Sequence, residues 1–318
     1  SRRRGHPRAV SSVRTVLGDI DPGDLGATYL HEHLIIDHPL VEDRFPHIFL
    51  PSAEDATREV RRCREAGVGA MVDAMPCASG RNVSKLAEVS RATGVHVIAS
   101  TGLHTAKYYA AAPWAFSLSP VALADLFTAD IEVGIDRFDY TGPVVDRTPH
   151  RAGIVKVATI GDSPSDAERR LFEAAAITHQ RTGAPVLTHC EEGRGAVAQV
   201  ELLAASGVDP SRVVISHTDK VRDLAYHRDL LATGVNVEYD QVLRQTEDTW
   251  TLDLIETMAS EGRLSQIMAG TDGARRTLWT ELGGGPGLAY LIEALQSRLG
   301  PEVCRAVLVD NPARLLAF

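Results

Sequence analysis

The chain has 318 residues, 44% of them hydrophobic and 24% charged, which is ordinary for a globular protein. Its 33 basic and 42 acidic residues give a net charge of -9, so we expect no nucleic-acid partner, and it contains no apolar run of about 18 residues that would cross a membrane. The four cysteines have no CxxC spacing, which argues against a disulfide scaffold or a zinc ribbon and favours a reducing, cytoplasmic location.

The N-terminal stretch is basic but lacks the apolar centre of a signal peptide. We therefore expect residues 1–12 to be a disordered tail or a cloning remnant and residues 13–318 to form a single domain. The segment VRTVLGDIDPGD, residues 13–24, predicts a short hairpin in front of the first strand.

Eight short apolar runs, rich in β-branched residues, recur along the chain and end in polar residues. Near-continuous apolar runs of this length are typical of parallel strands buried on both faces. The eight predicted strands are Ala27–Leu34, Val68–Met75, Val95–Leu103, Gly153–Thr159, Pro185–Cys190, Val213–Asp219, Val235–Asp240 and Gln266–Asp272.

Helical patterns lie between these runs. The clearest is 165–183, where Ser165 and Glu168 form a capping-box pair and Gly183 ends the helix. Alternating strands and helices predict an α/β fold with a parallel sheet, and eight such units fit a closed (β/α)8 TIM barrel whose bottom the hairpin covers. A doubly wound open sheet is the rival, but the GxGxxG turn typical of it is missing. The other predicted helices are 52–66, 83–93, 120–134, 196–206, 220–233 and 248–260.

Potential metal ligands gather at the ends of the predicted strands. His31 and His33 are two residues apart on the first strand, so their side chains share one face. His189, His217 and Asp272 end the fifth, sixth and eighth strands, where barrel enzymes carry their functional side chains. Because burying so many unpaired polar groups is costly, we expect them to share a cation.

Lys156 indicates that the predicted metal site holds two cations. It lies in the apolar strand GIVKVAT, where burial disfavours a charged ammonium and lowers the lysine pKa. A neutral amine can react with carbon dioxide to give a carbamate, whose two oxygens can bridge two cations in a binuclear site. The simpler alternative is a lysine paired with a carboxylate.

The order HxH, Lys, His, His and Asp at successive strand ends resembles the amidohydrolase superfamily. The opening VLGDIDPGDLGATYLHEHL is similar to that of the phosphotriesterase family, and GIVKVAT, VLTHC, VVISHTD and MAGTD match later family segments in order, so that the resemblance covers the chain from about Val13 to Phe318. The resemblance implies a metal-dependent hydrolase barrel, near the phosphotriesterase-homology proteins and the phosphorylated-sugar lactonases. It further implies that His31, His33 and Asp272 bind a buried metal, that His189 and His217 bind an exposed one, and that carbamylated Lys156 and a hydroxide bridge both.

Two divalent cations, with Zn²⁺ as the default, would lower the pKa of a shared water, and Asp272 would serve as ligand and proton acceptor. We expect the bridging hydroxide to attack a lactone or carboxylic ester that bears an anionic group. The alternatives are an amidase of N-acyl compounds, an organophosphate triesterase, a mononuclear deaminase, which Lys156 argues against, and a non-catalytic barrel. Related proteins are often dimers, so the resemblance also suggests a homodimer.

Candidate substrate contacts follow the strand ends. His104 stands in the loop STGLHTAKYY after the third strand, beside Tyr108 and Tyr109. Cations in the later loops would hold an anionic substrate, since arginine grips phosphate or carboxylate bidentately. The segment GARR followed by GGGPG is similar to the family branch that hydrolyses phosphorylated sugar lactones. The candidate cations are Lys220, Arg244, Arg275 and Arg276.

Overall fold

The structure, a computed structural model, describes residues 11–318. The tail expected over residues 1–12 therefore lies, except for its last two residues, outside the described part of the chain. Ser12 already exchanges backbone hydrogen bonds with Phe318, at 3.2 and 3.0 Å, so ordered pairing begins at the end of the predicted tail.

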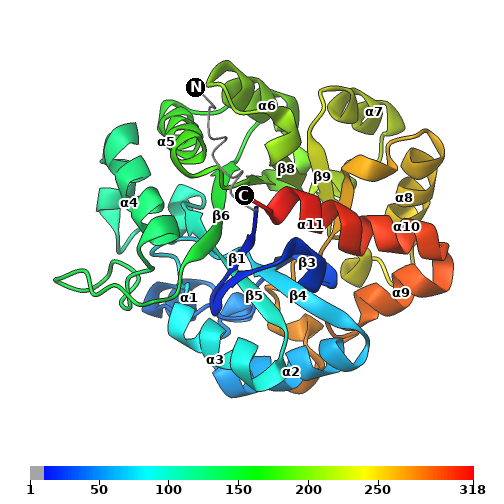
Figure 1. The fold of residues 1–318 in the computed structure, drawn as a ribbon, viewed down its shortest axis with the longest axis horizontal. Coiled ribbons are helices and arrows are strands. Elements are labelled where there is room, and N and C mark those ends of the chain that lie inside the picture. The colour runs from blue at the N-terminus through cyan, green and yellow to red at the C-terminus, as the bar shows by residue number, and fades with distance from the viewer. Residues whose placement is uncertain (1–10) are drawn as a thin grey trace, which may run out of the picture.

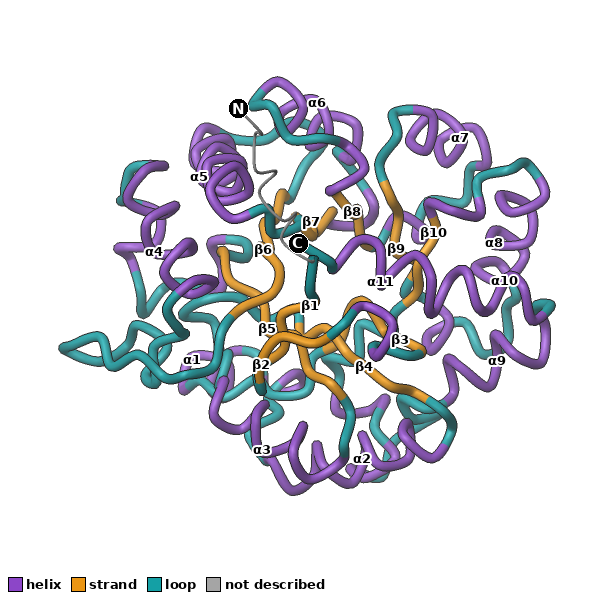
Figure 2. Tube along the Cα trace, in the orientation of Figure 1, coloured by secondary structure: helices purple, strands orange, loops and turns teal. Residues whose placement is uncertain are grey.

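Eight parallel strands form one sheet that curls into a barrel, with each strand next to its neighbour in the sequence (Figures 1 and 2). Backbone amides of Thr271 and Asp272, just after the last strand, donate to the carbonyl of His31 on the first at 3.2 and 3.0 Å and close the ring. The predicted (β/α)8 barrel is confirmed, and the open sheet is excluded. The strands are β3 (Ala27–Glu32), β4 (Val68–Asp73), β5 (His96–Gly102), β6 (Ala152–Thr159), β7 (Val186–Cys190), β8 (Val213–Ser216), β9 (Asn236–Tyr239) and β10 (Ile267–Ala269).

Helices surround this ring, as Figure 2 shows. The predicted capping box of α5 is present, with Ser165 and Glu168 bonded reciprocally and Gly183 in the left-handed conformation at the end. The helices are α1 (Pro39–Arg44), α2 (Ala53–Glu65), α3 (Val83–Thr93), α4 (Pro120–Glu132), α5 (Asp166–Thr182), α6 (Ala196–Ala205), α7 (Leu224–Ala232), α8 (Trp250–Ser260), α9 (Tyr290–Arg298), α10 (Pro301–Arg305) and α11 (Asn311–Leu316), with a π-helical segment at Ala306–Asp310.

One mouth of the barrel is covered by the two ends of the described chain. The predicted hairpin forms from β1 (Val13–Thr15) and β2 (Gly18–Ile20), and Val13 pairs with Ala317. In Figure 1, β1 and the C-terminus lie over the centre of the ring. Val13 and Leu316 join a buried cluster of inward strand residues, and the functional side chains are therefore left to the other mouth. The strand residues of this cluster are Leu30, Ala70, Val72, Ile98, Ile154, Leu187, Val214 and Met268.

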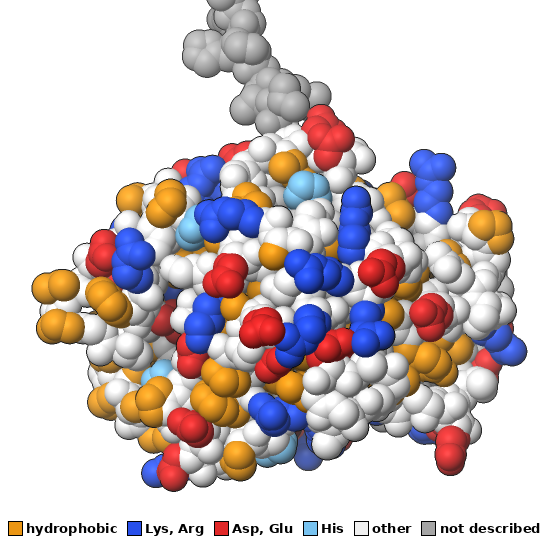
Figure 3. All heavy atoms as spheres, turned by 90° about the horizontal axis from the view of Figure 1, so that it is seen from below, with side chains coloured by type: hydrophobic (Ala, Val, Ile, Leu, Met, Phe, Trp, Pro, Cys, Tyr) orange, Lys and Arg blue, Asp and Glu red, His pale blue; other side chains and the backbone are white. Residues whose placement is uncertain are grey.

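The outer surface mixes basic and acidic side chains on the face seen in Figure 3. Exposed apolar side chains, among them Phe138, Val144 and Val145, occur in the long connection between α4 and β6, which protrudes on the left of Figure 1. No helix in the described part of the chain is both long and apolar enough to span a membrane.

Candidate metal centre and substrate cavity

The two histidines at the end of β3 face a carboxylate that follows β10. The Nε2 atoms of His33 and His31 lie 3.5 and 3.8 Å from Oδ1 of Asp272. All three side chains offer ligand atoms within 4.8 Å of one another. Residues 31, 33 and 272 thus meet although about 240 positions separate them in the chain, because the barrel closes between β3 and β10.

Lys156 is fully buried in the middle of β6, and its Nζ lies 3.3 Å from Nε2 of His31. Burial lowers the pKa of Lys156 to about 8, although the negative charges of Glu238 and Asp272 oppose this shift. An appreciable fraction of the amine is therefore uncharged near neutral pH, the form that reacts with carbon dioxide.

His189 in β7 and His217 after β8 form a second close pair. Nδ1 of His189 lies 2.8 Å from Nε2 of His217. Burial holds the pKa values of His189 and His31 well below the usual range, with neighbouring positive charges adding to the effect. Both rings are therefore neutral at physiological pH, which is the form that binds metals.

Two of these candidate ligands have a strained backbone. His217 and Asp272 adopt φ angles of 65° and 43°, a left-handed conformation that costs a non-glycine residue about 1–3 kcal/mol. Hydrogen bonds hold both turns, since the His217 amide donates to Asp240 at 3.0 Å and Glu32 accepts from the Thr271 amide at 2.8 Å. Strain that the surroundings enforce in this way is typical of functional sites.

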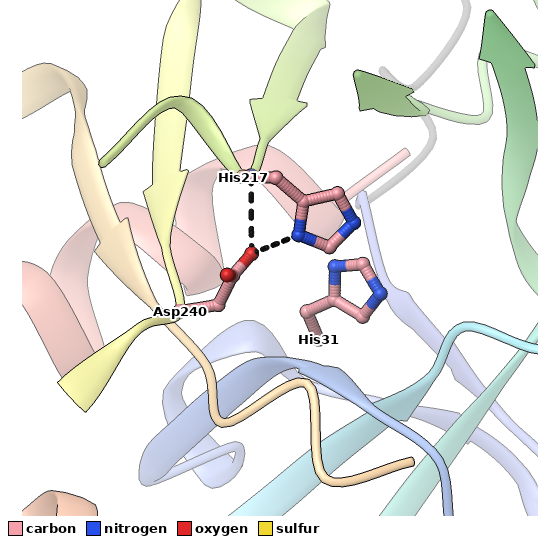
Figure 4. A group of neighbouring side chains, drawn as sticks. All are labelled: His31, His217 and Asp240. Carbon is pink, nitrogen blue, oxygen red and sulfur yellow. Dashed lines mark hydrogen bonds and ion pairs between the residues drawn. The ribbon is translucent and has the colours of Figure 1, made fainter. Parts of the chain in front are cut away.

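Carboxylates contact three of the four histidines, and none of these three carboxylates was predicted from the sequence. Oε2 of Glu238 lies 3.3 Å from Nδ1 of His31, and Oδ2 of Asp240 lies 2.6 Å from Nδ1 of His217. Figure 4 shows Asp240 beside His217, whose ring points toward His31. Such carboxylates commonly fix the orientation and tautomer of metal-binding histidines. The third is Glu191, which contacts Nε2 of His189 at 2.7 Å.

The convergent side chains fit divalent cations. The Lys156 amine can donate to Nε2 of His31 at 3.3 Å, whereas between His189 and His217 two ring nitrogens that can both carry lone pairs face each other at 2.8 Å. Opposed lone pairs in a buried site are unfavourable unless a proton or a cation lies between them. Imidazole, carboxylate and a carbamylated amine are suitable ligands for zinc and its neighbours.

A cavity of about 540 Å³ opens above these residues. Its wall contains the predicted contacts His104, Lys220, Arg244 and Arg275. Arg276 is not part of the wall, because its guanidinium donates to the carbonyl of Phe49 at 2.8 Å. The predicted substrate role of Arg276 therefore has no support in this geometry.

The cationic side chains of the cavity wall differ in the ion pairs and hydrogen bonds that they form within the protein. Lys220 lies 3.8 Å from Glu192, and Arg244 donates to the Asp272 carboxylate at 3.0 Å. Arg275 is exposed and has no ion pair or side-chain hydrogen bond within residues 11–318. Arg275 is thus the cavity cation most available to an incoming anion.

His104 is held rigidly beside the histidine pair. The Thr105 amide donates to its Nδ1 at 2.7 Å, and its ring lies 4.6 Å, centroid to centroid, from that of His189. Tyr108 packs edge-on against His104 and also lines the cavity. Tyr109 is buried instead, since its hydroxyl accepts from the His104 amide and donates to the carbonyl of Cys77.

Comparisons with known proteins identify relatives of this chain both by sequence and by structure. The phosphotriesterase family model matches residues 11–316. A phospho-furanose lactonase from Mycoplasmopsis synoviae is 31% identical, over 96% of this chain and 92% of the relative. An amidohydrolase structure from Mycoplasma synoviae superposes with a TM-score of 0.91 at 30% identity, over 97% of this chain and 92% of the other. A lactonase structure from Listeria monocytogenes gives a TM-score of 0.87 at 26% identity, over 97% and 99%.

Proposed function

Because this chain belongs to the phosphotriesterase family and is a metal-dependent hydrolase, we propose that it opens a lactone or carboxylic ester that bears an anionic group. One observation carries the choice of substrate. Metal-type ligands lie at the floor of a cavity whose wall presents cations, among which Arg275 has no acidic partner within residues 11–318. An anionic group on the substrate would provide that partner.

The proposed metal centre holds two divalent cations, with zinc as the default. His31, His33 and Asp272 would bind the more buried cation, and the facing nitrogens of His189 and His217 the more exposed one. Carbon dioxide would be held as the carbamate of Lys156, between both. When bound, two such cations lower the pKa of a shared water, so that hydroxide is available at neutral pH.

The side chains around the centre have separate tasks in this proposal. Asp272 accepts the proton released on attack and passes it to the leaving group or to solvent. Arg244 keeps the Asp272 carboxylate in place through the 3.0 Å contact. His104 and Tyr108 border the reacting carboxyl group, and Arg275 anchors the distant anionic group. Orientation by such contacts lowers the barrier without adding a reactive group.

The alternative substrates use the same centre but explain less of the cavity. A neutral organophosphate triester would leave Arg275 without a partner. An N-acyl compound with a carboxylate would satisfy Arg275 equally well, so the amide alternative differs only in the bond that is broken.

A substrate screen with the zinc-loaded protein tests the proposal. The panel contains phosphorylated and plain lactones, matched carboxylic esters, N-acyl amides and a neutral phosphotriester, and elemental analysis counts the metal in parallel. We expect the highest kcat/KM for a lactone with a phosphate or carboxylate. A higher kcat/KM for the neutral triester or the amide would overturn the substrate assignment, and a single tightly bound metal would overturn the binuclear centre.

A further inference from the structure

Glu191 contacts the candidate ligand His189 on the edge of the ring that faces away from His217. Its Oε2 lies 2.7 Å from Nε2 of His189, whereas Nδ1 of the same ring lies 2.8 Å from Nε2 of His217. A carboxylate oxygen can only accept a hydrogen bond. In the neutral ring, the proton must therefore be on Nε2, and the lone pair of Nδ1 must point toward His217.

His217 shows the opposite assignment. Its Nδ1 faces the Asp240 carboxylate, with Oδ2 at 2.6 Å, and in the neutral ring this ion-pair contact favours the proton on Nδ1 and the lone pair on Nε2. The two lone pairs thus face each other across 2.8 Å. Both nitrogens would be available as ligands to a divalent cation, when one is bound.

We propose that Glu191 is a positioning residue that selects the Nδ1-binding tautomer of His189, so that His189 and His217 together can hold the more exposed cation. The inference rests on the proposed metal centre and adds to it the residue that makes His189 bind through the ring nitrogen opposite to that of His217.

The chain turns sharply directly after Glu191. The chain turns in a short 3-10 segment, Glu191–Gly193, in which Glu192 adopts a left-handed conformation with φ 54° and ψ 25°. A Cβ on Gly193 would lie 2.8 Å from the Val221 side chain, so the tight turn needs glycine there. The strain and the close approach both indicate that the turn is enforced.

Lys107 holds the other oxygen of the same carboxylate. Its Nζ lies 3.7 Å from Oε1 of Glu191, which leaves Oε2 directed at His189. Glu192, the next residue, is the matched control. It also borders the cavity, but it pairs with Lys220 at 3.8 Å, has a side chain that is 72% exposed and contacts none of the four histidines.

The experiment compares Glu191→Ala, Glu191→Gln and Glu192→Ala with the wild-type protein. Zinc affinity is measured by competition with a chromogenic chelator, and nitrogen NMR of the histidine rings reports which nitrogen of His189 carries the proton in the metal-free protein. We expect Glu191→Ala to weaken the more loosely held zinc by about 10–100-fold and to mix the His189 tautomers. Glu191→Gln should keep most of the affinity, because its amide oxygen can still accept from Nε2. Glu192→Ala should bind zinc like wild type.

Equal zinc affinity and an unchanged His189 tautomer in Glu191→Ala would overturn the inference, and so would an equal loss in Glu191→Ala and Glu192→Ala, which would indicate an effect of net charge. Unchanged thermal unfolding of the metal-free variants excludes a folding defect, and Glu191→Leu, which fills similar space but cannot accept from Nε2, carries the test if Glu191→Ala unfolds. If the wild-type protein itself binds no second zinc, the proposed binuclear centre fails instead, which the wild-type titration reveals on its own.

Discussion

Arg244 donates through one nitrogen to the carboxylate of Asp272, at 3.0 Å, and to its backbone carbonyl. Its second terminal nitrogen donates to the carbonyl of Thr271, also at 3.0 Å. A residue that the sequence suggests as a substrate contact therefore also supports the residue proposed as metal ligand and proton acceptor. Burial alone would raise the pKa of Asp272, but the charge of Arg244, followed by contacts with the neighbouring histidines, holds it well below the usual value.

We expect Arg244→Lys to lower kcat about 10–100-fold on charged and uncharged esters alike, because a lysine cannot hold the carboxylate and the carbonyls together. Steady-state kinetics on a matched ester pair at full metal loading measures this. A loss confined to KM of the anionic ester would mean that Arg244 acts as a substrate anchor instead.

Asp272→Asn should reduce turnover by about 10²–10⁴-fold, because the amide has a similar shape but cannot accept the proton. Metal analysis must accompany the kinetics, since Asp272 is also a proposed ligand. Near wild-type turnover with both metals bound would show that another group accepts the proton.

Carbamate formation on Lys156 should depend on pH in the metal-free protein. With a pKa of about 8, about one tenth of the amine is neutral at pH 7 and about nine tenths at pH 9. At a fixed concentration of dissolved carbon dioxide, the rate of activation by zinc should therefore rise over this range. Activation that is independent of both carbon dioxide and pH would contradict the carbamate, as would two bound metals beside an unmodified lysine.

The fold was predictable because the local sequence patterns favour the same strands and helices that the barrel contains. The run GIVKVAT is β6 almost to the residue, and the caps Ser165 and Gly183 bound α5 as expected. The convergence of the candidate ligands was predictable for a related reason, since a parallel barrel brings the carboxyl ends of all strands to one mouth.

The supporting carboxylates were harder to predict, because Glu238 and Asp240 contact histidines of other strands and Glu191 lies in the loop that follows the strand of His189. Glu238 did leave a signal, since it is a charged residue inside the apolar strand β9, as Lys156 is inside β6. Arg275 and Arg276 show a different limit of sequence-based prediction. Their positions suggest a substrate role for both but do not tell which side chain reaches the cavity. They are adjacent and chemically identical in the sequence, and only the loop conformation directs one into the cavity and the other to Phe49.

That difference provides the sharpest test of the substrate class. Arg275→Ala should reduce kcat/KM for a phosphorylated lactone by about ten- to 150-fold, since a hydrogen bond to a charged group contributes about 1.5–3 kcal/mol. The same variant should hydrolyse an uncharged lactone almost as wild type does, because the metal ligands are untouched. Arg276→Ala removes the same charge one residue away, outside the cavity, and should leave both rates nearly unchanged. Equal losses in the two variants would indicate a general field effect or a disturbed loop, and an unaffected Arg275→Ala would remove the support for an anionic substrate.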